Sequence, residues 1–249
     1  MKRLISATAL ALLAGTASAA LVNLTGTVRD FNADFVNFEG TVTGLRTGAV
    51  ASTLSGAAPT LTASGATHIS NTGAGAFSNW YTKPTDTTAY SLSLSETFAG
   101  SGVYTYTNNN FFPIDGQLLG NQGRSHNYHF TYAIGTSFGY TQGAGQTFTF
   151  GGDDDVWVYF DGLLGIDLGG VHGFASQTVN LDTLFGAAGG RASGNYSFDF
   201  FFAERHTSGS NLTISTSLLL ANNTVPEPGS LALVAAALAA LGLRRVRRA

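Results

Sequence analysis

The stretch that most constrains the fold is residues 151–173, where two glycines and three aspartates precede a short apolar segment. That segment, Val156–Phe160, combines β-branched and aromatic residues over the length of a strand. The dipeptide Asp161-Gly162 follows it and is a strong signal for a two-residue hairpin turn. The pattern predicts a β-hairpin with an acidic loop at the end of one strand, where binding sites tend to concentrate.

The three adjacent carboxylates Asp153, Asp154 and Asp155 repel one another, and folding brings them closer together. Such a cluster needs a compensating positive charge or full exposure to water. Hard divalent cations, calcium above all, prefer oxygen ligands of this kind, and the preceding glycines allow a loop to wrap around an ion. The alternative is a solvated acidic loop that prevents edge pairing. Composition alone leaves both interpretations open.

The remainder of the central region is rich in alternating β patterns. Apolar and polar residues alternate over 128–134 and 212–218, and aromatic runs of strand length occupy 146–150 and 196–202. Period-two alternation with Gly, Asn and Asp between the runs is typical of antiparallel strands. We therefore predict an all-β antiparallel sandwich or barrel with no convincing helix. The Gly-, Ala-, Ser- and Thr-rich stretch Ala51–Ala76 is interpreted as a long surface loop or weak strands.

The N-terminus has the pattern of a secretory signal peptide. Lys2 and Arg3 precede the apolar run Leu4–Leu13, and Ala17-Ser18-Ala19 supplies a small-residue cleavage site. We predict that residues 1–19 are removed before Ala20. The apolar run is too short for a standard membrane span.

The C-terminus has a second targeting pattern. Residues 221–225 form a short polar linker, and Pro226, Glu227 and Pro228 precede the apolar run Leu231–Leu243 and a basic tail at 244–248. Thirteen helical residues at ~1.5 Å each reach ~20 Å, less than the ~30 Å of the hydrocarbon core. The segment resembles the PEP-CTERM sorting signal of Gram-negative bacteria. That resemblance implies transient inner-membrane association, processing by an exosortase-type enzyme and delivery to the cell envelope, outer surface or matrix. The alternative is a plain single-pass tail anchor.

Charge and cysteine content narrow the function classes. The leader holds two of the 12 basic residues, and the tail holds four arginines together with Glu227. The region between them keeps six basic and 14 acidic residues, a net charge of −8. This balance argues against nucleic acid or an anionic membrane as the partner of this region and suits cation binding. The chain contains no cysteine, which excludes disulfides and thiolate metal sites.

With residues 151–173 placed on a sheet, the region from about Leu24 to Leu218 resembles the fibro-slime family, relatives of the PA14 fold. The resemblance depends on a series of motifs in order, which are residues 27–31, 79–81, 111–116, 127–130, 151–173, 179–182 and 199–206. It implies one PA14-like β domain over residues 20–220, followed by a linker and sorting tail over 221–249.

The resemblance also implies a particular site. PA14-type lectins and adhesins carry two adjacent aspartates that ligate calcium, often across a cis peptide, with Asp-Gly after a short following strand. Asp153 and Asp154 match this spacing, because Asp161-Gly162 follows the strand. Asp155 stands where simpler motifs have Gly, so the pair Asp154-Asp155 is the alternative register.

Further polar residues are candidates for the same site. His172, between Gly170 and Gly173, could face a ligand bound at the acidic loop together with Asp167, or it could simply bond to the backbone. Glu204 follows an aromatic strand and could supply an ion ligand, whereas Arg205 is expected to form a salt bridge with an acidic residue.

Exposed aromatic residues could form surfaces on which sugars stack. Trp157 lies within a strand between two valines, which favours packing in the core. Trp80-Tyr81 and the pair Tyr104 and Tyr106 are better candidates for exposed aromatic surfaces.

Together these features predict an exported, non-enzymatic surface or matrix protein that binds glycan or exopolysaccharide with the help of calcium. One alternative is a purely structural matrix or biofilm protein in which calcium only stabilises the fold. The other is a glycoside hydrolase that uses two of the aspartates Asp153, Asp154, Asp155, Asp161 and Asp167. Hydrolases need two carboxylates ~5–9 Å apart across a cleft, and adjacent aspartates on one loop suit a cation better.

Overall fold

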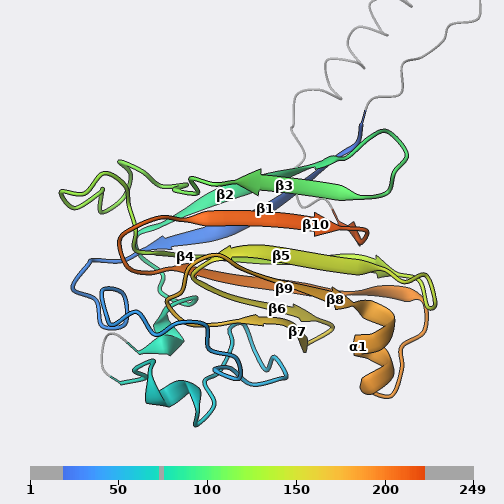
Figure 1. The fold of residues 1–249 in the computed structure, drawn as a ribbon, viewed down its shortest axis with the longest axis horizontal. Helices are drawn as coiled ribbons and strands as arrows, with labels where there is room; N and C mark the ends of the chain where they lie inside the picture. The colour runs from blue at the N-terminus through green and yellow to red at the C-terminus, as the bar shows by residue number, and fades with distance from the viewer. Residues whose placement is uncertain (1–18, 73–75, 222–249) are drawn as a thin grey trace, which may run out of the picture.

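The computed structural model describes residues 19–72 and 76–221. The strands of this part form one large antiparallel sheet (Figure 1). Its strands are β1 (Leu21–Asp30), β2 (Thr87–Glu96), β3 (Tyr104–Asn108), β4 (Phe130–Tyr140), β5 (Thr147–Asp153), β6 (Asp155–Phe160), β7 (Leu163–Leu168), β8 (Ala175–Asn180), β9 (Gly194–Glu204), β10 (Asn211–Thr216) and β11 (Leu219–Leu220). The helical elements are η1 (Gly65–Thr67), η3 (Phe77–Asn79) and α1 (Leu181–Ala187).

The sheet curves until its two edges meet. The strand order is β7-β6-β9-β4-β1-β2-β3-β10-β5-β8, and β11 pairs with β4. Gln177 on β8 joins the edges, because its Oε1 accepts from Asp167 N at 2.8 Å and its Nε2 donates to Gly165 O at 3.4 Å on β7. The predicted all-β antiparallel architecture is confirmed, and it has the form of a nearly closed barrel.

The main core fills the interior of this curved sheet. It contains alternate residues of each strand, such as Val156, Val158 and Phe160 of β6 and Phe198, Phe200 and Phe202 of β9. These side chains lie on one face because strand residues alternate between faces. The interior contacts are largely aromatic.

A second core covers the outer face of β6 and β9. Trp157 and Tyr159 point away from the interior and pack with Trp80, Phe38 and other residues of the segment between β1 and β2. This segment, blue to cyan, lies below the sheet in Figure 1. Strand β6 is therefore buried on both faces, which explains why its residues Val156–Phe160 do not alternate between apolar and polar types.

The second core overturns one prediction from the sequence, because Trp80 and Tyr81 are buried and are not exposed aromatic surfaces. Within the described residues 51–72, Ile69 is buried in this core and Leu54 and Leu61 pack against it. The isolated β-bridges of Thr53 with Leu163 and of Leu61 with Val50 agree with the weak-strand alternative for this stretch and not with a pure surface loop. Burial of Trp157 is confirmed.

One short helix was missed. Helix α1 begins after Asn180, whose side-chain Oδ1 accepts from Thr183 N at 3.0 Å. Its buried residues Leu181 and Phe185 pack against the main core. Seven residues are too few to show helical periodicity in a sequence, although an Asn N-cap is a recognised start signal.

The predicted hairpin after β6 is confirmed. Asp161 and Gly162 form the two-residue connection to β7 and have φ values of 51° and 71°. Positive φ at both positions is what a type I′ turn requires.

Two predictions concern segments beyond the described part of the chain. Residues 1–18 of the predicted signal peptide at 1–19 lie outside it, as do residues 222–249 of the predicted linker and sorting tail at 221–249. Among the residues that the structure describes, no helix is long and apolar enough to cross a membrane.

Candidate functional site

The acidic loop connects two parts of the sheet that do not pair with each other. Asp153 is the last residue of β5, which lies between β10 and β8. Asp155 is the first residue of β6, which lies between β9 and β7. The peptide bond between Asp153 and Asp154 is cis. The chain thus crosses the curved sheet within three residues, at the position where the carboxylates lie.

Asp155 belongs to a buried ion pair. Arg205 Nε donates to Asp155 Oδ2 at 2.6 Å, and Gly170 N donates to Asp155 Oδ1 at 2.5 Å. Arg205 also donates to Asn37 O at 2.9 Å and lies over the ring of Trp80. The predicted salt bridge of Arg205 is therefore confirmed. Each oxygen of Asp155 accepts one hydrogen bond within the protein, and Asp155 is not among the residues that line the pocket described below.

Asp154 is buried and accepts only from backbone groups. His172 N donates to its Oδ1 at 2.9 Å, and Arg205 N donates to its Oδ2 at 3.2 Å. Burial raises the pKa of Asp154 to about 8, and the neighbouring Asp155 carboxylate adds to this rise. Two neutral donors do not compensate the desolvation of a charged carboxylate here, so this side chain would gain from a nearby cation.

Asp153 is anchored by a residue distant in sequence. Asn211, at the start of β10, donates to Asp153 through its backbone N and through Nδ2, the latter at 2.9 Å. These bonds orient the carboxylate at the end of β5.

Glu204 is a fully buried carboxylate with an unused oxygen. It ends β9, and its Oε2 has no hydrogen-bond partner. Burial raises the pKa of Glu204 well above its ordinary value, and the Asp154 carboxylate raises it further. An unsatisfied buried acceptor is costly, so a group that fills this place would stabilise the fold.

His172 presents a buried nitrogen in the same region. Its Nδ1 lies 2.6 Å from Gly173 O, an interaction in which only the ring can donate. In the neutral ring the lone pair is then on Nε2, which is buried without a partner. This ring position combines both predicted alternatives, because the side chain bonds to the backbone and still lies at the site.

These residues line one pocket with a volume of about 320 Å³. The pocket brings together the predicted residues Asp153, Asp154, His172 and Glu204. The other residues around it are Val42, Val171, Gly173, Arg205, His206, Ser208, Gly209 and Asn211. Among the described residues, no group of three or more His, Asp or Glu side chains is arranged closely enough to hold a metal ion by itself.

Asp167 lies apart from this pocket, against the sequence-based expectation. Its Oδ2 accepts from Gly48 N at 2.6 Å, and its position on β7 is opposite Trp157. Because side chains alternate along β7, Asp167 points to the face that carries the second core, where it anchors the residue-48 loop.

Sequence reasoning missed Asn211 and Val42. Asn211 is 58 positions from the aspartate that it orients, and Val42 is more than 100 positions from the acidic loop. No short motif links either residue to the loop, so only the pairing of β10 with β5 and the course of the loop after β1 could place them.

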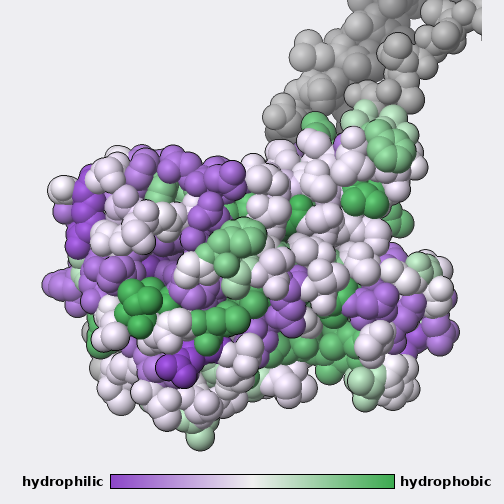
Figure 2. Space-filling model, in the orientation of Figure 1, coloured by the Kyte–Doolittle hydropathy of each residue, from purple (hydrophilic) through white to green (hydrophobic). Residues whose placement is uncertain are grey.

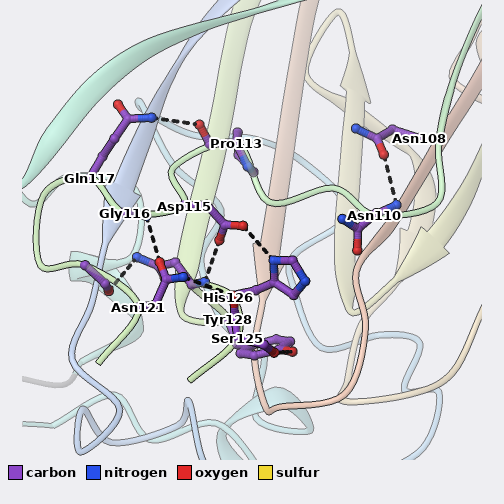
Figure 3. A network of polar contacts seen from close by, with 12 residues as sticks. Asn108, Asn110, Pro113, Asp115, Gly116, Gln117, Asn121, Ser125, His126 and Tyr128 are labelled. Carbon is purple, nitrogen blue, oxygen red and sulfur yellow. Dashed lines mark hydrogen bonds and ion pairs between the residues drawn. The ribbon is translucent and has the colours of Figure 1, made fainter. Parts of the chain in front are cut away.

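A second polar cluster organises the loop between β3 and β4 (Figure 3). Asp115 Oδ2 lies 2.6 Å from His126 Nδ1, and the His126 ring stacks on Phe112. Ser125 Oγ bonds to Tyr128 OH at 2.8 Å rather than to His126, so these residues do not form a nucleophile–base pair. The contacts of this cluster stabilise the conformation of the loop between β3 and β4.

The family model of the PEP-CTERM protein-sorting motif matches residues 224–248. The chain carries a PEP-CTERM sorting signal. This signal confirms the interpretation of Pro226, Glu227 and Pro228 and identifies an exported, cell-surface protein.

The chain is similar to psi proteins of Dictyostelium discoideum. It is 44% identical to protein psiQ over 144 residues, 50% to psiC over 139 and 47% to psiD over 137. Each match covers 52–53% of this chain but only 14–26% of the relative. These fibro-slime-like homologues confirm the predicted resemblance.

Two solved structures with similar folds are PA14 domains. One is titled a PA14 sugar-binding domain from an RTX adhesin, with 11% identity and a TM-score of 0.32 over 78% of this chain and 89% of that one. The other is the PA14 domain of the MpAFP antifreeze protein, with 10% identity and a TM-score of 0.32 over 85% and 86%. Both are distant likenesses.

Proposed function

We propose that this exported protein is a non-enzymatic surface binding protein, whose pocket at Asp153 and Asp154 takes a calcium ion and, through it, glycan hydroxyls. The observation that carries the proposal is the charge balance at this pocket. Asp154, Asp155 and Glu204 are buried, Asp153 is partly buried, and the single guanidinium among the pocket residues, that of Arg205, is paired with Asp155.

A bound cation would compensate the carboxylates of this pocket that Arg205 does not pair with. The free Oε2 of Glu204 and the raised pKa values of Asp154 and Glu204 mark carboxylates that lack a positive partner. Calcium accepts six to eight oxygens, including backbone carbonyls and hydroxyls, so it does not need three acidic side chains. Asp153 and Asp154 would hold the ion, and Glu204 would supply a further oxygen from β9.

Bound calcium would supply open coordination positions for vicinal sugar hydroxyls. The chain's own residues do the rest. Asn211 orients the carboxylate of Asp153, and the backbone N–H of His172 holds that of Asp154. The Nε2 of His172 offers an acceptor for one ligand hydroxyl.

The pocket lies far from the ends of the described chain. Glu204 pairs with Phe130 at one end of β4, and Leu220 pairs with Phe138 eight positions further along. At ~3.4 Å per residue the separation is ~27 Å. Strand β1 also begins at the end opposite the pocket, since its last residue, Asp30, pairs with Phe130. A protein held at its C-terminal side would thus present this pocket outward.

The first test is calcium-dependent stability of the purified exported protein. A ligand that binds only the folded state stabilises it by RT ln(1 + [L]/Kd), about 2.7 kcal/mol at a hundredfold excess over Kd. For a domain of this size we expect the melting temperature to rise by roughly 5–10 °C. Asp153→Asn combined with Asp154→Asn should abolish the rise.

Asp161→Asn is the matched control, because it removes an aspartate in the hairpin turn away from the pocket and should leave the rise intact. A melting temperature that stays unchanged up to about 10 mM calcium would exclude the metal site.

The second test separates glycan binding from a structural role. A glycan array should show binding in calcium that disappears with chelator, while circular dichroism shows that the fold persists. An array without signal at saturating calcium would instead favour a structural matrix protein with a stabilising ion. Release of reducing sugar that is lost in Asp153→Asn would favour a glycoside hydrolase.

A further inference from the structure

The rim of the pocket carries exposed apolar side chains. Phe174 is 60% exposed and directly follows Gly173, which lines the pocket, and Val42, also in the lining, is 57% exposed. Figure 2 shows hydrophobic side chains among hydrophilic ones over the loops at the left-hand end of the molecule. Ligand sites commonly combine apolar and aromatic side chains with a few polar groups, so exposed apolar side chains beside a polar pocket are candidates for contact with a ligand.

Phe174 is held against the sheet. Its ring covers the backbone of Gly151, since a Cβ placed at Gly151 would lie only 2.6 Å from the ring's Cζ atom. The next residue, Ala175, pairs with Gly152 on β5. The ring is therefore positioned by the same strand that ends in Asp153, and the rest of its surface faces solvent.

Val42 is brought to the pocket by a separate contact. Gly44 N donates to Val171 O at 2.9 Å and Arg46 N donates to Gly169 O at 2.5 Å, so the chain after Val42 runs beside the loop that leads to His172. Two segments distant in sequence thus supply apolar surface around one pocket.

The pocket and its immediate surroundings consequently have two chemical characters. Asp153, Asp154, Glu204 and His172 line the pocket with polar groups. Val42 in the lining and Phe174, which directly follows the lining residue Gly173, are exposed apolar side chains. A neutral pyranose has the complementary character, because hydroxyls surround its rim and C–H groups cover at least one face. Aromatic rings with one side anchored are suited to pack on such a face.

We infer that Phe174, with Val42, forms the apolar wall that packs on the C–H face of a neutral pyranose and so selects the sugar at this pocket. The inference rests on the proposed function, because it assumes that the sugar hydroxyls are held at the acidic side. It assigns Phe174 to sugar selection and not to calcium binding.

The test compares Phe174→Ala with Phe98→Ala. Phe98 is 68% exposed and lies in the connection between β2 and β3, so it is a matched loss of an exposed ring. Affinity for the sugar found on the array, and for methyl galactoside, mannoside and glucoside, is measured by calorimetry in saturating calcium. We expect Phe174→Ala to weaken binding about tenfold, equal to about 1.4 kcal/mol, and Phe98→Ala to leave it unchanged.

Two further measurements distinguish selection from structure. The calcium-induced rise in melting temperature should be the same in Phe174→Ala as in the original chain, and Phe174→Trp should retain sugar binding. Unchanged sugar affinity in Phe174→Ala would overturn this inference and leave the proposed function intact. A lost calcium response in Phe174→Ala would also overturn it, because the ring would then be a structural support. Absence of any sugar binding by the original chain would overturn both.

Discussion

The three adjacent aspartates of the acidic loop lie in three different environments. Asp153 is oriented by Asn211, Asp154 is buried among backbone donors, and Asp155 is paired with Arg205. The division follows from geometry, since the chain passes from β5 to β6 at this point and each successive side chain meets a different part of the sheet. Only the first two line the pocket.

At this scale we predict that Asp155→Asn strongly destabilises the fold. The substitution leaves the buried guanidinium of Arg205 without its counter-charge, which typically costs about 3–5 kcal/mol. Denaturant unfolding, monitored by circular dichroism, measures the change in free energy of unfolding.

Asp161→Asn is the control for this prediction as well. Asp161 pairs with Arg191 in a partly exposed salt bridge, and such pairs contribute about 1 kcal/mol or less. Equal effects of the two substitutions would contradict the assignment of Asp155 to a buried structural pair.

At the scale of single elements, glycines mark where strands approach closely and where a helix is weak. A Cβ at Gly26 on β1 would lie 2.3 Å from Ala133 O and 2.8 Å from the side chain of Ile134. Gly186 lies within α1 and has open space around its Cα. The same substitution should thus act in opposite directions at the two positions.

We predict that Gly26→Ala destabilises the protein by about 1–3 kcal/mol, because neighbouring strands must separate to admit the methyl group. Gly186→Ala should stabilise it by about 0.5–1 kcal/mol, because alanine restricts the unfolded chain and favours the helix. Thermal unfolding of both variants tests the pair. A stabilising Gly26→Ala would show that β1 and β4 are not this close.

At the scale of the whole molecule, the second core joins the loops between β1 and β2 to the sheet. Trp80, Phe38 and Phe77 pack against Trp157 on the outer face of β6. The same packing brings Asn37 to Arg205. The conformation of the segment between β1 and β2 and that of the acidic site therefore depend on the same set of packing contacts.

The sorting signal leads to a prediction about the mature protein. Because the motif at 224–248 is a sorting signal, we expect the surface form to lack the arginines after Leu243, removed by an exosortase-type enzyme. Mass spectrometry of the protein recovered from the cell surface measures its C-terminus. An intact basic tail on that form would favour a plain membrane anchor.

Local sequence patterns determined much of this protein. Alternation of apolar residues predicted the antiparallel strands, and Asp161-Gly162 predicted the turn, because side-chain period and turn dihedrals depend on neighbouring residues alone. The acidic loop, His172 and Glu204 were also recognised, since carboxylate clusters and strand ends are visible in one dimension. Helix α1 was missed because seven residues carry too little periodicity.

Only the tertiary structure decided what each of these residues does. Trp80 is buried and Asp155 pairs with Arg205 because segments 50 or more positions apart come into contact. Asp167 lies away from the pocket because its side chain is on the same face of the sheet as Trp157. The same holds for Asn211, Val42 and the ring of Phe174 over Gly151. Such contacts are set by how the curved sheet brings distant strands together, and no local pattern records which face of a strand the loops will cover.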